Sequence, residues 1–306
     1  MNINPIRTLE TEQRNPCTNN IDSMSTLEIL TVINEQDALI ASAVQKCLPY
    51  LAEMVENICN RIMHGGHLYY IGAGTSGRLG VLDASECPPT YGVSSQMVQG
   101  IIAGGDSALR VSSEGTEDDP FQGQKDLIHF GLSKEDAVIG LAASGRTPYV
   151  IGALDYANSI GAYTGAVSCV SNAQISGHAQ TAVEAITGPE VITGSTRMKA
   201  GTAQKMILNM ISTSVMIKAG KVYQNLMVDV IPSNEKLIFR AAGIIQECTG
   251  RNQEQALKVL KTSQHSVKHA IFMEITGLTL EQAQKHLERA NGRLQAALNH
   301  YWKSET

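Results

Sequence analysis

Short apolar runs that alternate with helical stretches constrain the fold of this sequence more than any other feature. The runs are rich in β-branched and aromatic residues, which favour strands, and the stretches between them have the apolar spacing of helices. Expected strands cover residues 68–72, 97–103, 137–142, 163–169 and 183–186, and expected helices cover 77–84, 120–130, 148–160 and 198–220. Such alternation predicts an α/β fold with a mainly parallel sheet between helices, and with ligands at the carboxyl ends of the strands.

The regions on either side of this alternating part show helical patterns only. Apolar residues recur at helical spacing between residues 26 and 63. After Pro232 five amphipathic helices are expected, at 233–247, 253–264, 267–275, 279–289 and 292–301. The sequence therefore predicts three parts: an N-terminal helical segment, 1–57, that packs on the body or on a partner subunit, an α/β domain, 58–231, and a small helical domain, 232–306.

The composition is typical of a globular protein that binds a small molecule. The formal net charge of −5 and the lack of a basic run give no positive field for nucleic acid. No apolar segment has the length of a membrane span and no signal-peptide core is present, so we expect a cytoplasmic protein without a membrane partner. The cysteines form no Cys-x-x-Cys pair and the histidines lack ligand spacing, so neither disulfides nor a metal site is expected.

Three loops rich in glycine and hydroxyl residues each follow a predicted strand and precede a helix. They are Gly74-Thr-Ser-Gly-Arg78, Ala143-Ser-Gly-Arg-Thr-Pro148 and Thr193-Gly-Ser-Thr-Arg-Met-Lys-Ala-Gly-Thr202. Glycine lets the backbone approach an anion, the helix N-terminus favours negative charge, and hydroxyls add donors, so a phosphate is the expected ligand. A single loop of this kind is often only a turn, but three of them in one chain are stronger evidence for a phosphate site. The spacings of a nucleotide P-loop and of a dinucleotide fingerprint are absent, which favours a sugar phosphate.

Four basic residues lie just inside the expected helix starts of these loops. They are Arg78, Arg146, Arg197 and Lys199. Their side chains could neutralise a phosphate or a substrate carboxylate through charge-assisted hydrogen bonds, or they could form ion pairs within the protein. The pattern leaves both interpretations open.

Two glutamates are candidates for acid and base chemistry. Glu86 lies in Asp83-Ala-Ser-Glu-Cys-Pro-Pro89, and Glu117 lies in Ser112-Ser-Glu-Gly-Thr-Glu-Asp-Asp-Pro120. Both segments are expected to leave the sheet at its carboxyl edge, so the pair could divide the work of base and acid if their strands are neighbours. For Glu117 alone, an acidic charge at a helix N-terminus is the simpler interpretation. Cys87 has no histidine near it in sequence, so packing is favoured over a nucleophilic role.

Four runs resemble the N-acetylmuramic acid 6-phosphate etherases, which belong to the sugar isomerase (SIS) domain superfamily. They are Ile71-Gly-Ala-Gly-Thr-Ser-Gly-Arg-Leu-Gly80, Leu82-Asp-Ala-Ser-Glu-Cys-Pro-Pro-Thr-Tyr-Gly92, Ala142-Ala-Ser-Gly-Arg-Thr-Pro-Tyr149 and Gly194-Ser-Thr-Arg-Met-Lys-Ala-Gly-Thr-Ala-Gln-Lys205. The similarity covers nearly the whole chain from about Ser25, and Ser85-Glu-Cys-Pro-Pro-Thr-Tyr-Gly92 is far more specific than the loops of SIS domains in general. The resemblance implies a SIS-type, flavodoxin-like α/β domain followed by a small helical domain that resembles a ubiquitin-associated (UBA) bundle.

The resemblance also implies an activity. It is that of a lyase which cleaves the D-lactyl ether of N-acetylmuramic acid 6-phosphate by eliminating lactate and adding water. The products would be N-acetylglucosamine 6-phosphate and D-lactate, formed without a cofactor, in amino-sugar catabolism and cell wall recycling. By motif position the two glutamates of the family fall on Glu86 and Glu117, which favours the catalytic interpretation of Glu117.

Analogy with SIS domains further implies a phosphate site and an assembly state. Thr75, Ser76, Ser144 and Thr147 correspond to the hydroxyls that bind the phosphate, and Ser195 and Thr196 would line the same cleft. SIS domains commonly form dimers with sites near the interface, so a homodimer is implied.

The chemistry of the implied reaction agrees with two carboxyl groups. Opening of the sugar exposes an aldehyde at C1, which acidifies the proton at C2, and departure of lactate from C3 requires a proton donor. We hypothesise that Glu86 is the acid and Glu117 the base, with the reverse assignment left open. A sugar-phosphate aldose-ketose isomerase and a non-catalytic sugar-phosphate sensor are the alternatives. Release of D-lactate would exclude the isomerase, and binding without turnover would support the sensor.

Overall fold

The computed structural model describes residues 9–111, 115–232 and 234–305, and it divides the chain into two compact units. The first unit comprises the chain up to Ser85 together with Ser95–Ser212, and the second comprises Glu86–Ser94 together with the chain from Thr213 onward. Residues 1–8, 112–114, 233 and 306, which belong to predicted segments, lie outside the described residues. The domain limits predicted after residues 57 and 231 remain a prediction.

The N-terminal part of the first unit is helical, as predicted. From residue 9 onward, the 3-10 turns Glu10–Glu12, Pro16–Thr18 and Ile21–Ser23 precede α1 (Thr26–Asp37), α2 (Ile40–Gln45) and α3 (Leu48–Met63). A capping box between Ser25 and Glu28 begins α1, which buries none of its residues. Helix α3 buries one apolar face, formed by Leu51, Met54, Val55, Ile58, Cys59 and Ile62.

The predicted parallel sheet is confirmed, and the structure adds its strand order. The strands are β1 (Leu68–Gly72), β2 (Val98–Ile102), β3 (Ala137–Leu141), β4 (Tyr163–Ser168) and β5 (Thr181–Glu184). They pair in parallel in the order β2-β1-β3-β4-β5, which is the flavodoxin-like order. Because the strand order reverses direction between β1 and β3, the crevice beyond their carboxyl ends is where a ligand is expected.

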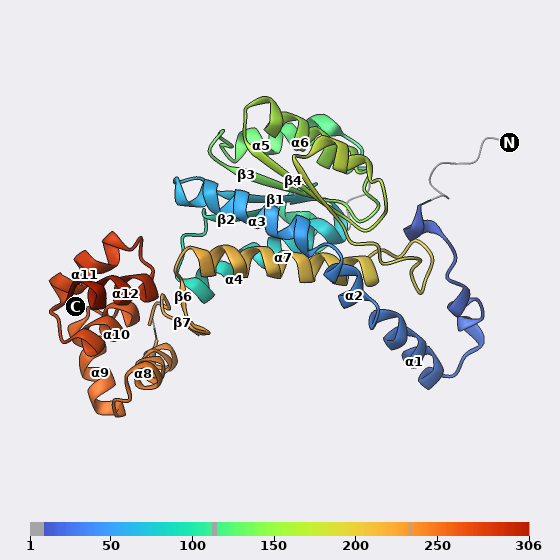
Figure 1. Cartoon of the computed structure of the whole chain (residues 1–306). Helices are drawn as coiled ribbons and strands as arrows, with labels where there is room; N and C mark the ends of the chain where they lie inside the picture. Colours follow the sequence, from blue (N-terminus) through green and yellow to red (C-terminus); the bar gives the residue numbers. More distant parts are fainter. Residues whose placement is uncertain (1–8, 112–114, 233, 306) are drawn as a thin grey trace. The chain divides into compact units, whose positions relative to one another are not determined.

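Helices cover both faces of this sheet (Figure 1). On one face lie α5 (Pro120–His129) and α6 (Pro148–Ser159), and on the other lie α3, α4 (Gly74–Tyr91) and α7 (Lys199–Lys218). Strand side chains alternate between two buried layers. Tyr69 and Ile71 pack with α5 and α6. Tyr70 faces α4, since a Cβ atom placed on Gly80 would lie 2.9 Å from the Cβ of Tyr70. The sheet is thus buried on both sides.

Helix α4 is longer than the sequence pattern predicts. An end near residue 84 is wrong, because the helix continues through Pro88 and Pro89 to Tyr91. A proline lacks the N–H that an interior helix position donates to the carbonyl four residues earlier, which is why the pair predicts a break. The helix ends instead where the Gly92 N–H donates to the carbonyl of Pro88 at 2.9 Å. Glu86 therefore lies within a helix rather than on a loop.

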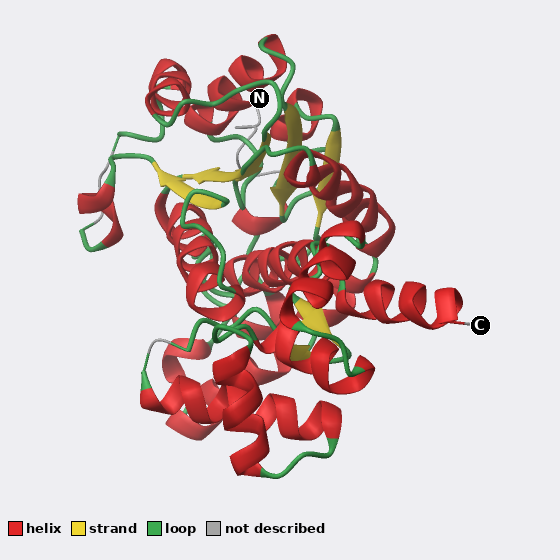
Figure 2. Ribbon diagram, turned by 90° about the vertical axis from the view of Figure 1, so that its left-hand side faces the viewer, coloured by secondary structure: helices red, strands yellow, loops and turns green. Residues whose placement is uncertain are grey.

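The second unit contains the predicted C-terminal helices. These are α8 (Glu235–Thr249), α9 (Gln253–Thr262), α10 (Val267–Thr276), α11 (Leu280–Arg289) and α12 (Leu294–Glu305). Figure 2 shows how helix dominates this part of the chain. A short antiparallel hairpin, β6 (Val222–Tyr223) and β7 (Leu226–Met227), precedes them and has no counterpart among the predicted strands.

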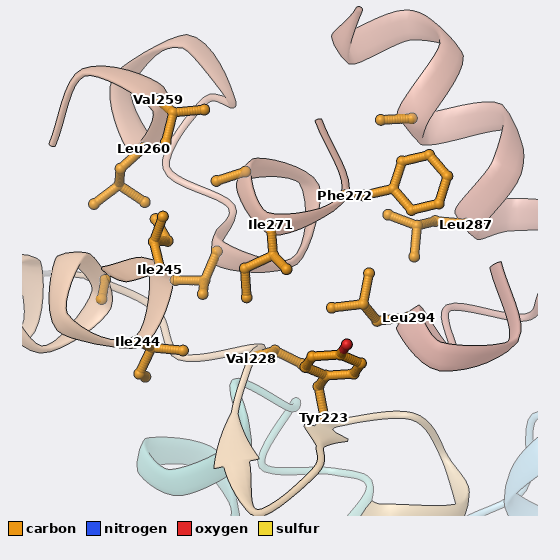
Figure 3. Packing of buried hydrophobic residues seen from close by; sticks show 14 of the residues in the cluster. Tyr223, Val228, Ile244, Ile245, Val259, Leu260, Ile271, Phe272, Leu287 and Leu294 are labelled. Atoms are coloured by element: carbon orange, nitrogen blue, oxygen red, sulfur yellow. The ribbon is translucent and has the colours of Figure 1, made fainter. Parts of the chain in front are cut away.

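A continuous apolar core holds the helices of the second unit together. Figure 3 shows Ile245, Ile271, Phe272 and Leu287 converging in it, with Val228 from the segment after the hairpin. Each of these side chains is at most 3% exposed. The bundle therefore has a hydrophobic core of its own.

Candidate functional site

The first two glycine and hydroxyl loops begin at neighbouring strand ends. Gly72, the last residue of β1, pairs with Leu141, the last residue of β3. The start of α4 lies tightly against β1, because a Cβ atom at Gly77 would be 2.6 Å from the carbonyl oxygen of Gly72. The loops therefore flank the crevice where the strand order reverses, as predicted for a phosphate site.

The third loop lies beside the first. A Cβ atom at Gly201 would be 3.5 Å from the methyl carbon of Thr75 and 3.4 Å from the backbone oxygen of Thr196. Ser76 Oγ donates a 2.7 Å hydrogen bond to Gln204 Oε1 of α7, and Ser76 is only 7% exposed. The structure thus brings Thr75, Ser76 and Thr196 together, with the hydroxyl proton of Ser76 engaged inside the protein.

The second loop presents Ser144 and Thr147, both half-buried, at the start of α6. Gly145 has a φ of +70°, and a Cβ atom there would lie 2.5 Å from the Cβ of Ala173, so this turn requires glycine. Thr147 is the N-cap residue of α6, but its side chain accepts no capping hydrogen bond. That hydroxyl is placed where a phosphate oxygen could bind.

The start of α7 already holds a carboxylate of the protein itself. The fully buried Glu190 accepts hydrogen bonds from the backbone N–H groups of Lys199 and Ala200, each at 2.9 Å. Lys199 Nζ donates to Gln36 Oε1 at 3.1 Å. Burial raises the pKa of Glu190 and lowers that of Lys199. For Lys199 the structural interpretation holds, because its ammonium group is bonded to Gln36.

Arg78 also has a structural role. Its Nε donates to the carbonyl of Leu109 at 3.1 Å and its Nη2 to that of Ala108 at 2.7 Å. These bonds fix the short 3-10 helix Asp106–Leu109, which follows β2, against α4. Arg146 and Arg197 are exposed, so they remain candidates for contact with a substrate.

Glu117 lies exposed on the turn before α5. Its backbone oxygen accepts a 3.0 Å hydrogen bond from the N–H of Tyr149, in the first turn of α6. The N-cap of α5 is Asp119, whose carboxylate accepts from Phe121 N at 2.9 Å, so the capping role falls on Asp119 and not on Glu117. The turn that carries Glu117 is therefore fixed beside the start of α6.

A cavity of about 840 Å³ opens next to this turn. Its lining includes residues of β2 and the two glycines after it, and also Thr116, Asp119 and Gln122. Glu117 thus stands at the margin of a space large enough for a sugar phosphate.

Glu86 lies exposed on α4, one helical turn after Asp83. Asp83 is 9% exposed and accepts a 3.1 Å hydrogen bond from Ser212 Oγ, and burial raises its pKa. Cys87 is 2% exposed, in agreement with a packing role. Glu86 belongs to the second unit and Glu117 to the first, so their meeting in one site stays a prediction.

No group of three His, Cys, Asp or Glu side chains in the described part is arranged to hold a metal ion. None of the described helices combines the length and the apolar character that a membrane crossing requires.

Comparison with known proteins relates two stretches of the chain to described families. Residues 50–158 match the family described as glucokinase regulatory protein N-terminal SIS domain, and residues 268–306 match the UBA-like domain. An N-acetylmuramic acid 6-phosphate etherase of Clostridium botulinum is 61% identical over 271 residues, which are 89% of this chain and 90% of the relative. One of Bacillus pumilus is 53% identical over 301 residues, 98% and 99% of the two chains.

The chain belongs to the N-acetylmuramic acid 6-phosphate etherases. Its membership confirms the resemblance seen in the motifs and makes this etherase an enzyme of the lyase class. The isomerase and the sensor are not favoured. A solved structure from Bacteroides fragilis, a candidate phosphosugar isomerase involved in capsule formation, is 15% identical with a TM-score of 0.50. It covers 66% of this etherase and 95% of its own chain, and it bears on the fold alone.

Proposed function

We propose that this etherase cleaves the D-lactyl ether of N-acetylmuramic acid 6-phosphate with Glu117 as the base and Glu86 as the acid. The observation that carries the proposal is the hydrogen bond between the Tyr149 N–H and the Glu117 carbonyl. It fixes the turn of the proposed base against the helix whose N-cap is Thr147, a proposed phosphate ligand. A substrate held by its phosphate at this helix would therefore present its carbon chain near Glu117.

The phosphate would bind at the starts of α4 and α6. Thr75, Ser144 and Thr147 are proposed to bind it through their hydroxyls and Ser76 through its backbone N–H in the first turn of α4, because its hydroxyl donates to Gln204; Ser195 and Thr196 lie on the third loop beside them. Helix N-termini and hydroxyls suit a phosphate group, and the glycines of the loops allow close approach. Because the first two N–H groups of α7 bind Glu190, the charge of the phosphate is left to α4 and α6.

The reaction needs two proton transfers that two carboxyl groups can perform. Glu117 removes the C2 proton of the open-chain sugar, and the electron pair forms a C2–C3 double bond conjugated with the C1 aldehyde. The C3–O bond breaks, and Glu86 protonates the departing lactate oxygen. Water then adds across the double bond, with its oxygen at C3 and a proton returning to C2, which gives N-acetylglucosamine 6-phosphate and D-lactate.

A homodimer would complete the site. Glu86 lies 12 residues after Gly74 in the same helix, which is about 18 Å along the axis. That separation exceeds the span from phosphorus to C3 in a hexose 6-phosphate, so the Glu86 of a second subunit is better suited to act on a phosphate bound at Gly74. Helix α1, which buries no residue and leaves Leu27 and Leu30 exposed at 74% and 59%, supports such an assembly.

The substrate also suggests the place of the reaction. Its phosphorylated sugar cannot cross a membrane unaided, which supports a cytoplasmic enzyme. Its lactyl ether distinguishes N-acetylmuramic acid, a sugar of the bacterial cell wall, from N-acetylglucosamine. This supports a role in amino-sugar catabolism and cell wall recycling.

The test separates the two glutamates by two readouts. Glu117→Ala and Glu86→Ala are each assayed for lactate release and for entry of solvent deuterium at C2 of the substrate. We expect both variants to lose lactate release by at least about 100-fold, since general acid and base groups contribute on this scale. Only Glu86→Ala should still exchange the C2 proton. Glu254→Ala, at an exposed position of α9, is the matched control. Full lactate release by both variants would refute the proposal.

A further inference from the structure

An ion cluster in the second unit is centred on Asp229. Asp229 accepts from two lysines, from Lys221 Nζ at 2.9 Å and from Lys268 Nζ at 2.8 Å. Lys268, on α10, is only 7% exposed, and burial lowers its pKa while Asp229 opposes that change. A buried ammonium group is tolerated when it is paired in this way, and removal of one partner leaves an uncompensated charge.

Asp229 is held rigidly by its neighbours in the sequence. Val228 and Val230 are 1% and 5% exposed and belong to the core of the helical bundle. In Figure 3 Val228 reaches into this core from below, beside Tyr223. The two valines and the two ion pairs together fix the backbone at residue 229.

The backbone of Asp229 in turn supports the end of α4. A Cβ atom at Gly92 would lie only 2.1 Å from the carbonyl oxygen of Asp229, and Gly92 has a φ of +63°. Only glycine permits this approach. Since the Gly92 N–H closes the last turn of α4 by bonding the carbonyl of Pro88, the helix end rests directly on Asp229.

This helix end has fewer hydrogen bonds of its own than an ordinary helix. Pro88 and Pro89 donate no N–H, so two bonds are missing in the turn that includes Glu86. Contacts from outside the helix must compensate for that loss. Besides the contact with Asp229, Tyr91 Oη donates to Thr213 Oγ1 at 3.5 Å.

We propose that Lys221, Asp229 and Lys268 form a positioning cluster that fixes the end of α4 and, through it, the carboxyl group of Glu86. The C-terminal helical bundle would then serve the reaction by holding the acid in place. The inference depends on the proposed role of Glu86. The three residues act through the helix and touch no substrate.

The test removes the buried charge and follows two steps of the reaction separately. Lys268→Met keeps an apolar side chain of similar length but leaves Asp229 with one partner. We expect lactate release to fall at least tenfold in kcat with KM changed less than twofold, since the phosphate loops belong to the other unit. Exchange of the C2 proton should stay near the parental rate, because Glu117 is untouched. Lys268→Arg should restore most of the lactate release.

Controls separate positioning from general damage to the fold. Lys261→Met, at an exposed position of α9, should match the parent in all three measurements. If Lys268→Met does not fold, Lys221→Met removes the more exposed lysine, at 23% of its side chain, and should show the same pattern more weakly. A variant that folds but loses exchange and lactate release in equal proportion would overturn the inference.

A double variant distinguishes this inference from the proposed function. Adding Lys268→Met to Glu86→Gln should cause no further loss, because both changes act on the same group. If Glu86→Gln alone is fully active, the proposed function fails. If Glu86→Gln is inactive and Lys268→Met keeps full activity, only the positioning role fails.

Discussion

At the scale of single residues, the structure separates groups that hold the protein together from groups left to a ligand. The sequence predicts hydroxyl and basic residues at the starts of three helices, and they lie at or near those starts, although Arg146 and Arg197 come two residues before α6 and α7 rather than inside them. It cannot predict that Ser76 is bonded to Gln204, 128 residues away, or Lys199 to Gln36, 163 residues away. Such partners depend on tertiary packing, whereas motif spacing reports only the local chain.

Two substitutions should therefore have different effects on this enzyme. Ser76→Ala leaves the fully buried Gln204 amide without its partner and should lower the free energy of unfolding by about 1–3 kcal/mol. Thr147→Val should leave stability unchanged and raise KM about tenfold, since its hydroxyl makes no capping bond. Denaturant unfolding and steady-state kinetics measure the two effects. Equal losses of stability in both variants would contradict this division.

Asp83 should make stability depend on pH. Burial raises its pKa above the value in the unfolded chain, so the folded state is favoured while the carboxyl is protonated and loses this advantage as pH rises through the folded pKa. Asp83→Asn cannot ionise, so its stability relative to the parent should increase from pH 4 to pH 7.5. Unfolding in denaturant across this range is the measurement, with the exposed Asp22→Asn as a flat control. A relative stability that decreases with pH would exclude the explanation.

At the scale of helices and strands, local signals predict the elements well except where distant contacts dominate. Residues 68–72 form a strand as predicted, because their β-branched and aromatic residues are buried on both faces. Helix α4 exceeds its prediction because contacts at Gly92 support a turn that Pro88 and Pro89 weaken. The β6–β7 hairpin has strands of two residues, too short for any periodicity to appear. Strand order depends on crossovers that no local pattern encodes.

The start of α7 should be the most sensitive helix end in the first unit. Glu190→Ala removes the acceptor of two buried N–H groups, and we expect it to destabilise the protein by about 3 kcal/mol. Glu190→Gln keeps one side-chain oxygen and should cost less than Glu190→Ala. Thermal and denaturant unfolding would rank the variants, and the opposite order would refute the capping role.

At the scale of the whole molecule, the sequence predicts an α/β part and a helical part, and the structure adds how they share the chain. Residues 86–94, which include the end of the helix that follows β1, group with the C-terminal helices, while the start of the same helix belongs to the α/β part. No local signal reveals this, because it arises from contacts such as that of Gly92 with Asp229. The two predicted catalytic residues consequently fall in different units.

A mixing experiment tests whether two subunits share each site. When the inactive Glu86→Ala and Glu117→Ala chains are unfolded and refolded together, half of the dimers are hybrids. Each hybrid has one site with both glutamates if they come from different subunits, so about a quarter of parental activity should return. Mixtures of either variant with itself are the control. No recovery, despite hybrids seen by mass spectrometry, would place both glutamates of a site in one chain.

The position of β2 at the margin of the sheet has a consequence for how such enzymes diversify. Within the described sheet β2 pairs with β1 alone, so the segment that follows it can change in length or sequence while only one ladder is disturbed. The proposed base is carried there, whereas the phosphate loops follow the central strands β1 and β3. A descendant of this chain could thus acquire a new reaction through changes after the edge strand and still bind phosphorylated sugars at the unchanged central loops.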